Sequence, residues 1–207
     1  MGDGTDWRGV WTGRLVRRRQ RAATFVDGVC ARSAAALWDV HIGEGCVFHG
    51  RPIFNRIPHS VIWVGDSCVF RSAPWSNRIG VNRPCMLSTL TEDARISIGD
   101  LCGFSGTVVA AASEISMGDR VLCGANVTIT DTDWHGMRPP RACYEPAATA
   151  PVRICDDVWL GLGVVVLKGV TIGKGTIVAA GSIVTKSIPE GVVAAGSPCE
   201  VIGEIQE

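Results

Sequence analysis

The C-terminal half of the chain repeats every six residues, and this period constrains the fold more than any other feature. Aliphatic side chains recur in step at Ile154, Leu160, Val166, Ile172, Val178 and Val184. The fifth position of each hexad is small or apolar, as at Val158 and Val164. A short fixed period is typical of a parallel β-helix, in which each hexad forms a strand and a corner and successive coils pair about 4.8 Å apart. We therefore predict an all-β fold, a parallel β-helix of hexapeptide repeats.

The same register continues upstream with interruptions. In-step groups of apolar residues occur at Ile42, Phe48 and Phe54, at Val64 and Phe70, at Ile98 and Phe104, and at Met117, Cys123 and Ile129. The step from Ile129 to Ile154 spans 25 residues and includes the run ThrAspThrAspTrpHisGlyMetArgProPro, which has no hexad pattern. Long loops in compact folds are commonly functional. We expect an extruded loop near residues 130–153 to carry the chemistry.

The composition favours a single folded domain preceded in the sequence by a basic N-terminal arm. The chain has 207 residues, of which 46% are hydrophobic and 25 are glycines, which suits short strands and tight corners. We assign residues 41–203 to the β-helix and residues 1–40 to an N-terminal arm or cap of unknown structure. Twenty basic and twenty acidic residues cancel, so no nucleic-acid partner is expected. Six arginines crowd the first 21 residues, and a solvated tail or a first edge strand is favoured there over a phosphate or membrane contact.

The cellular location and the metal content are predicted from sequence features that are missing: long apolar runs and closely spaced cysteines. No apolar run reaches the ~18 residues of a membrane span, and the arginine-rich start has no apolar centre like that of a signal peptide. We expect a cytoplasmic protein without a transmembrane segment. The nine cysteines include no CxxC pair, and the closest two, Cys143 and Cys155, are 12 positions apart. Because Cys46, Cys68 and Cys102 occupy small hexad slots, we expect free core thiols and no metal site.

One histidine stands out by its position. His41, His49 and His59 flank hexads or irregular stretches and suit turn or edge positions. His135 alone lies in the long break, next to Trp134 and two residues after Asp133. An imidazole can accept a proton at neutral pH, and a nearby carboxylate can fix its tautomer. From the residues alone, a catalytic base and an exposed loop histidine both remain open.

Four segments resemble the hexapeptide-repeat acyltransferases, in the sugar O-acetyltransferase branch of maltose, galactoside and polysaccharide-decorating enzymes. They read AsnValThrIleThrAspThrAspTrpHisGly from Asn126, ValTrpLeuGlyLeuGlyValValValLeuLysGlyValThrIleGly from Val158, AlaAlaGlySerIleValThrLysSerIlePro from Ala179, and AlaAlaGlySerProCys from Ala194. The similarity is close over 117–203 and looser over 40–116. It implies a left-handed β-helix, although general crossover preference favours the right hand. It also implies a homotrimer that holds acetyl-coenzyme A between subunits.

The resemblance assigns roles to particular residues. It makes His135 the general base and leaves Asp133 to orient His135, to bind the acceptor or to cap the loop. The positions that match coenzyme A contacts are Trp159, Ala180, Thr185 and Lys186. Gly161 and Gly163 stand at corners where backbone N–H groups could stabilise an oxyanion. Two arginines of the family's closing motif are Glu200 and Gly203 here. Lys168, Lys174 or the basic arm would then have to meet the nucleotide phosphates.

The expected activity is transfer of an acetyl group from acetyl-coenzyme A to a hydroxyl of a sugar or glycoconjugate. Trp134 offers a face for a sugar ring, and Asn77, Asn82 and Arg83 in the polar stretch 71–85 could meet its hydroxyls. Three alternatives stay open: an N-acetyltransferase of amino sugars, an antibiotic-inactivating acetyltransferase, and a structural β-helix without an active site. Cys143 in the loop also leaves a covalent acetyl-enzyme route open.

Overall fold

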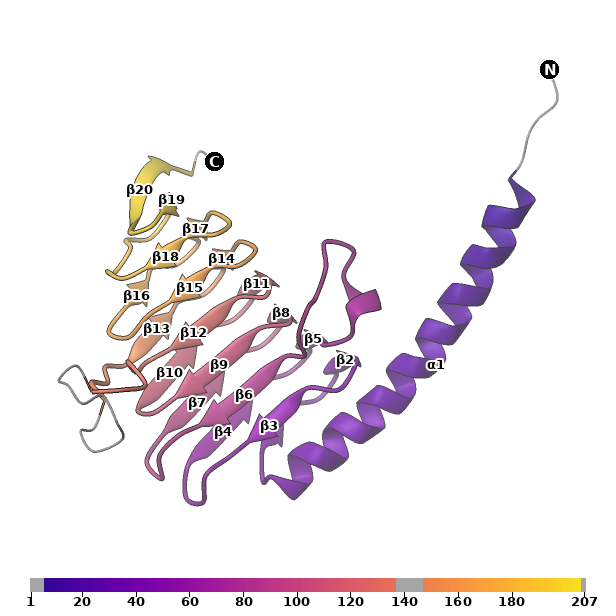
Figure 1. Ribbon diagram of the computed structural model, residues 1–207, viewed down its shortest axis with the longest axis horizontal. Coiled ribbons are helices and arrows are strands. Elements are labelled where there is room, and N and C mark those ends of the chain that lie inside the picture. Colours follow the sequence, from indigo (N-terminus) through magenta and orange to yellow (C-terminus); the bar gives the residue numbers. More distant parts are fainter. Residues whose placement is uncertain (1–5, 137–146, 206–207) are drawn as a thin grey trace.

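Three sheets wrap around one apolar core in the computed structural model, which describes residues 6–136 and 147–205 (Figure 1). Sheet A comprises β1 (His41–Ile42), β4 (Val61–Val64), β7 (Arg95–Ile98), β10 (Glu114–Met117), β13 (Val152–Ile154) and β16 (Thr171–Ile172). Sheet B comprises β2 (Val47–His49), β5 (Val69–Arg71), β8 (Gly103–Ser105), β11 (Leu122–Ala125), β14 (Trp159–Leu160), β17 (Ile177–Val178), β19 (Val192–Gly196) and β20 (Cys199–Glu204). Sheet C comprises β3 (Ile53–Asn55), β6 (Met86–Thr89), β9 (Val108–Ala111), β12 (Thr128–Thr130), β15 (Val165–Val166) and β18 (Ile183–Val184).

The chain visits sheets A, B and C in turn, so that each full coil adds one strand to every sheet. Neighbouring coils pair in parallel, as in β10 with β13 and β12 with β15. The final pair, β19 with β20, is antiparallel. We name the turns between sheets the A–B, B–C and C–A corners. The predicted parallel β-helix is confirmed.

The hexad positions form the core. Phe48, Phe70 and Phe104 stack from coil to coil, with ring centroids 5.2 and 4.9 Å apart, and all three are buried. The regular repeats continue the core with Ile154, Leu160 and Val166. Like side chains align because parallel strands place equivalent residues above one another. Phe104 is therefore a packing residue, as its hexad slot indicates.

The cysteines of the described ranges are free thiols, and those in hexad slots are buried as predicted. The Sγ atoms of Cys46, Cys68 and Cys102 lie 3.2–3.3 Å from glycine carbonyl oxygens of the following coil. Hydrogen bonding to Cys102 and burial raise the pKa of Cys68 to about 12. These thiols act as small core residues rather than as nucleophiles.

A ladder of carboxylates runs along the A–B corner. Each of its members accepts a hydrogen bond from a backbone N–H of the preceding coil at 2.7–3.1 Å; they are Asp66, Asp100, Asp119 and Asp156. The residue before three of them is glycine, and a Cβ on Gly99 would collide with the carboxylate of Asp119. The recurring GlyAsp pair therefore joins one coil to the next.

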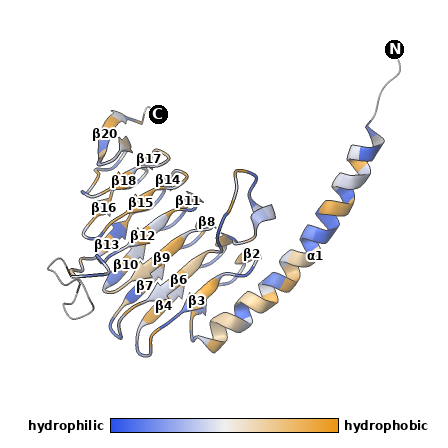
Figure 2. Cartoon of the chain, in the orientation of Figure 1, coloured by the Kyte–Doolittle hydropathy of each residue, from blue (hydrophilic) through white to orange (hydrophobic). Residues whose placement is uncertain are grey.

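The N-terminal arm is a helix, α1 (Trp7–Leu37), rather than the tail or edge strand that the sequence favoured. Residues 14–27 contain neither proline nor glycine and include five arginines, which suit a helix. Asp6 caps the helix by accepting a hydrogen bond from the Gly9 N–H at 3.0 Å. Ala31 and Ala35 pack into the core beside the first coil. The hydrophilic first half extends away from the coils (Figure 2).

Two long connections interrupt the coils, as the breaks in the register predict. The B–C excursion (residues 72–85) joins β5 to β6 and contains the short helix η1 (Pro74–Ser76). The C–A loop (residues 131–151) joins β12 to β13. They leave the tube at different corners and on opposite sides of it (Figure 1). Within the described ranges, no helix has the length and apolar character that a membrane span requires.

Candidate functional site

The C–A loop is closed at its base by backbone pairing. The Asp133 N–H donates to the Ala148 carbonyl at 3.1 Å, and the Ala150 N–H donates to the Asp131 carbonyl at 3.0 Å. Thr132 and Thr149 form an antiparallel bridge between these bonds. His135 follows two residues beyond this neck, and its side chain is exposed. Cys143 lies outside the described residues, so the covalent route stays a prediction.

A buried carboxylate anchors the neck to the preceding coil. Asp131 has 0% exposure, and its two oxygens accept hydrogen bonds from the backbone N–H groups of Ala112 and Ser113, both at 2.7 Å. A buried carboxylate is stable only when it is hydrogen-bonded in this way. Asp131 therefore fixes the start of the loop rather than taking part in its chemistry.

The backbone just before His135 adopts an uncommon conformation. Trp134 has φ +66°, in the left-handed region that a bulky residue rarely occupies. Its N–H lies 3.3 Å from the hydroxyl oxygen of Thr132, and its ring is 54% exposed. Such conformations persist where surrounding bonds enforce them and cluster at functional sites. The neck thus turns both Trp134 and His135 toward solvent at the C–A corner.

Asp133 pairs with a lysine from the next coil. Its Oδ1 accepts a hydrogen bond from Lys168 Nζ at 2.6 Å, and both side chains are about one-third exposed. Among the described residues, no hydrogen bond joins Asp133 to His135. The pair ties the loop to the next turn of the C–A corner. It also occupies Lys168, one of the cations expected to meet nucleotide phosphates.

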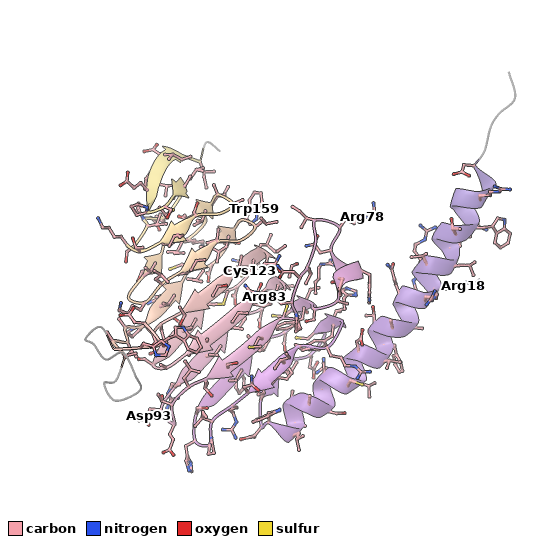
Figure 3. The ribbon with its side chains drawn as sticks, viewed as in Figure 1. Arg18, Arg78, Arg83, Asp93, Cys123 and Trp159 are labelled. Carbon is pink, nitrogen blue, oxygen red and sulfur yellow. The ribbon has the colours of Figure 1, made fainter. Side chains whose placement is uncertain are left out.

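The residues predicted to contact the cofactor divide between two corners. Thr185 and Lys186 are exposed on the C–A corner, the same corner that carries the His135 loop. Gly161 and Ala180 lie on the B–C corner, and Trp159, 51% exposed, stands on the outer face of sheet B beside them. Figure 3 shows Trp159 on one side of the tube and Asp93, on the C–A corner, at the opposite edge. One copy of the chain therefore does not bring all these residues together.

The backbone N–H groups of the two glycines predicted as oxyanion donors already donate hydrogen bonds in this structure. The Gly161 N–H donates to the Val178 carbonyl at 2.7 Å, and the Gly163 N–H donates to the Ala125 carbonyl at 2.8 Å. Both donors are thus used by bonds between coils. Gly161 has a packing reason to be glycine, because a Cβ there would lie 2.6 Å from the Ala180 nitrogen. Any contact of Gly161 with a cofactor would have to use its carbonyl or Cα.

Within one copy of the chain, the predicted acceptor residues of the B–C excursion bind the coil and lie away from the His135 loop of the same copy. Arg83 donates to the Gly106 and Asn126 carbonyls at 3.0 and 2.8 Å and to the Thr128 hydroxyl at 2.7 Å. Asn77 donates to the Ser105 hydroxyl at 3.1 Å, and the Asn82 N–H donates to the Asn126 side chain at 3.3 Å. Arg83 is therefore a positioning residue for the excursion. Of the four predicted acceptor residues, the structure places only Trp134 beside His135.

The residues that anchor the C–A loop and the B–C excursion carry no recognisable local motif in the sequence. In the sequence Asp131 is only a neighbour of His135, because its hydrogen-bond donors come 18 and 19 residues earlier. Asn126, with φ +62°, holds the excursion through its side chain, and no motif marks that role. The GlyAsp pairs of the A–B corner, in contrast, recur visibly along the chain. Within the described part of the chain, no three His, Cys, Asp or Glu side chains gather as metal ligands.

The repeats are similar to those of known bacterial transferases. Residues 151–186 match the family described as bacterial transferase hexapeptide (six repeats). Galactoside O-acetyltransferase of Escherichia coli (strain K12) is 45% identical over 96 residues, which cover 45% of each chain. This chain spans about half the length of the curated relatives it matches.

Solved structures agree with the fold. A galactoside acetyltransferase in complex with coenzyme A is 37% identical with a TM-score of 0.52, and the match covers 61% of this chain and 62% of that one. A hexapeptide-repeat acetyltransferase from Vibrio cholerae O1 biovar eltor, complexed with acetyl-coenzyme A, is 29% identical with a TM-score of 0.53 and covers 60% and 66%. The left-handed parallel β-helix and the resemblance to hexapeptide-repeat acyltransferases are confirmed.

Proposed function

Because residues 151–186 are hexapeptide repeats of the bacterial transferase type, we propose that this chain is an acetyl-coenzyme A-dependent O-acetyltransferase. Its acceptor is a hydroxyl of a sugar or glycoconjugate, and His135 is the general base. The observation that carries this proposal is the exposed His135 on a loop whose neck is pinned by Asp131 and by three backbone contacts. A structural β-helix without an active site would not require an anchored loop that exposes a histidine.

The residues of the C–A corner suit this chemistry. The thioester supplies an activated acetyl group, so the protein needs to supply a base and alignment. His135 takes the proton of the acceptor hydroxyl while that oxygen bonds to the acetyl carbon. The carbon–sulfur bond breaks, and the proton passes to the leaving sulfur. The exposed Trp134 ring offers a stacking face for the acceptor sugar.

The division of the cofactor residues supports a site shared between two copies. Thr185 and Lys186 lie with His135, whereas Trp159, Gly161 and Ala180 lie on the other side of the tube. A second copy whose sheet B faces the C–A corner would complete the set, as in the homotrimer that the family resemblance implies. The exposed Lys186 ammonium suits a phosphate at that corner. Glu200, exposed on β20, does not.

Acetyl transfer to a panel of sugars tests the role of His135. We expect His135→Ala to lower kcat by about 10²–10⁴-fold, the usual contribution of a general base. His59→Ala is the matched control, because His59 is also exposed and also follows an irregular turn. Unchanged turnover in His135→Ala would refute the mechanism. Loss of activity in Cys143→Ser with full activity in His135→Ala would establish the covalent route instead.

Mixing two inactive variants tests whether the site is shared. We expect His135→Ala and Trp159→Ala each to be inactive alone and to regain activity when unfolded together and reassembled. One site of a mixed oligomer then receives both intact residues. No recovery, with mixed oligomers demonstrated by mass spectrometry, would place the whole site within one copy. Preferential acetylation of amino sugars in the panel would favour the N-acetyltransferase alternative. The cytoplasmic location stays a prediction.

A further inference from the structure

A basic pocket lies between α1 and the B–C excursion, away from the His135 loop. Its volume is about 460 Å³, and its lining comes from α1, from β2 and β5, and from the excursion. Four arginines line it, Arg17 and Arg21 from the helix, Arg71 at the end of β5, and Arg78 in the excursion. Figure 3 labels Arg78 on the excursion and shows α1 alongside. The pocket thus gathers cations from segments fifty or more residues apart in the sequence.

The positive charge of the pocket is not balanced by the described residues. No ion pair within 4.0 Å joins Arg17, Arg21, Arg71 or Arg78 to a carboxylate of residues 6–136 or 147–205. The nearby Asp27 is directed elsewhere, since it accepts the Gly50 N–H at 2.8 Å and lies 3.7 Å from Arg51. Guanidinium groups held together without counter-charges repel one another, and a bound oxyanion would relieve that repulsion.

The inner wall of the pocket is ordered by its own contacts. His49 Nδ1 lies 2.9 Å from the Thr24 hydroxyl, and the His49 ring meets Trp75 edge-on with centroids 5.9 Å apart. Arg71 donates to the Ser76 carbonyl at 2.9 Å, which fixes one guanidinium at the wall. Burial, then the charge of Arg71, holds the pKa of His49 below its usual range, against the opposing effect of Asp27. The wall therefore presents a fixed cation beside aromatic and hydroxyl groups.

We propose that this pocket binds an oxyanion-bearing saccharide, with its carboxylate or phosphate on the arginines and its ring beside Trp75. Arginine forks match both oxyanions, and the volume exceeds that of an isolated oxyanion by enough to admit a sugar ring. The Gln20 side chain lines the same space and offers a partner for sugar hydroxyls, whereas the Thr24 and Ser76 hydroxyls, which donate to the Gln20 and Ala73 carbonyls, can only accept there. The saccharide part rests on the proposed function: the acceptor would be a longer acidic glycan, of which the pocket holds a charged sugar other than the one that reacts at His135. The oxyanion part stands on the pocket alone.

Direct binding to the 207-residue chain without acetyl-coenzyme A tests the proposal. Isothermal titration would use trigalacturonate and glucose 6-phosphate as the two oxyanion sources, inorganic phosphate as the bare ion, and maltotriose as the neutral sugar. The pocket variant is Arg17→Gln, Arg21→Gln and Arg78→Gln together. The control variant is Arg8→Gln, Arg14→Gln and Arg18→Gln, which removes the same charge from positions of α1 outside the pocket. None of the six side chains is buried, so neither variant disturbs the core.

We expect at least one acidic sugar to bind, the pocket variant to weaken that binding about 10-fold or more, and the control variant to change it less than about 2-fold. NMR should show the pKa of His49 rising on binding in wild type and not in the pocket variant. If both variants weaken the binding of the acidic sugar equally, or if maltotriose binds as tightly as the acidic sugar, the assignment of this pocket as an oxyanion site is wrong. Binding of inorganic phosphate alone would overturn the saccharide part. His135→Ala should bind like wild type even if transfer fails, which separates this proposal from the activity.

Discussion

Gly161 and Trp134 show what single positions contribute to this fold. Gly161 is required by space, because the backbone of Ala180 occupies the place of its Cβ. Trp134 shows the opposite case, in which a bulky side chain accepts a left-handed backbone because the loop neck enforces it. At Gly161, the functional prediction and the packing requirement coincide at one residue. Only a measurement of stability separates them.

Gly161→Ala should destabilise the protein by about 1–3 kcal/mol, because the new methyl group would lie 2.6 Å from the Ala180 nitrogen. Gly203→Ala is the control, since a methyl group added there would meet no atom within 4 Å, and it should change stability by less than about 0.5 kcal/mol. Chemical denaturation of both variants measures the difference. A stable Gly161→Ala variant with a raised KM for acetyl-coenzyme A would show that the cofactor, and not packing, requires the glycine.

Two elements leave the tube, and polar contacts hold each of them, joined in the B–C excursion by the buried side chains of Val81 and Cys85. The B–C excursion rests on Arg83 and Asn126. The C–A loop rests on its paired neck, on Asp131 and on the ion pair between Asp133 and Lys168. Because these contacts differ in burial, they should differ in energy. Buried charged hydrogen bonds contribute far more than a partly exposed ion pair does.

Asp131→Ala should cost about 2–4 kcal/mol, because two partly buried backbone N–H groups lose the buried carboxylate that accepts from them. Asp133→Ala should cost at most about 1 kcal/mol, since it removes only a partly exposed ion pair. Thermal unfolding of the two variants gives the comparison, and acetyl transfer shows whether either change misplaces His135. Equal costs would mean that Asp131 does not anchor the loop.

The whole molecule is a stack in which each coil contacts mainly the coils beside it. The Phe48–Phe70–Phe104 column holds the first three coils, and aliphatic residues hold the later ones. Stability in such a fold is approximately a sum over coils and their interfaces. Damage to the first coils should therefore remain largely local. The proposed active site draws on the later coils, and the basic pocket on the first ones.

Phe70→Ala should cost about 3–5 kcal/mol through the cavity that it leaves. Hydrogen exchange should lose protection in the coils from β1 to β8 and keep most of it in the coils from β13 to β18, because the defect lies between Phe48 and Phe104. Ile172→Ala is the matched change at the other end, where Ile172 has 0% exposure. Uniform loss of protection in both variants would show that the tube unfolds as one cooperative unit.

The six-residue period alone predicts the coil, its core and the place where the coil is interrupted. A six-residue period leaves one way to bury every apolar position, so Phe70, Cys68 and Leu160 could be assigned to the core without coordinates. The break after Ile129 identified the His135 loop for the same reason. The helix was missed because an arginine-rich segment without hexads carries no periodic signal of that kind, and among its described side chains only Ala31 and Ala35 are buried against the core.

Which residues share a corner follows only from the folded coils, because the interruptions between strands differ in length. In the folded chain, Gly161 and Arg83 lie away from His135 of the same copy. The Gly161 N–H donates a hydrogen bond between coils, and Asp133 forms an ion pair with Lys168. Folding also brings Arg17 and Arg21 to Arg71 and Arg78. Contacts between such distant residues arise only when the coils stack, so no local pattern of the chain could reveal them.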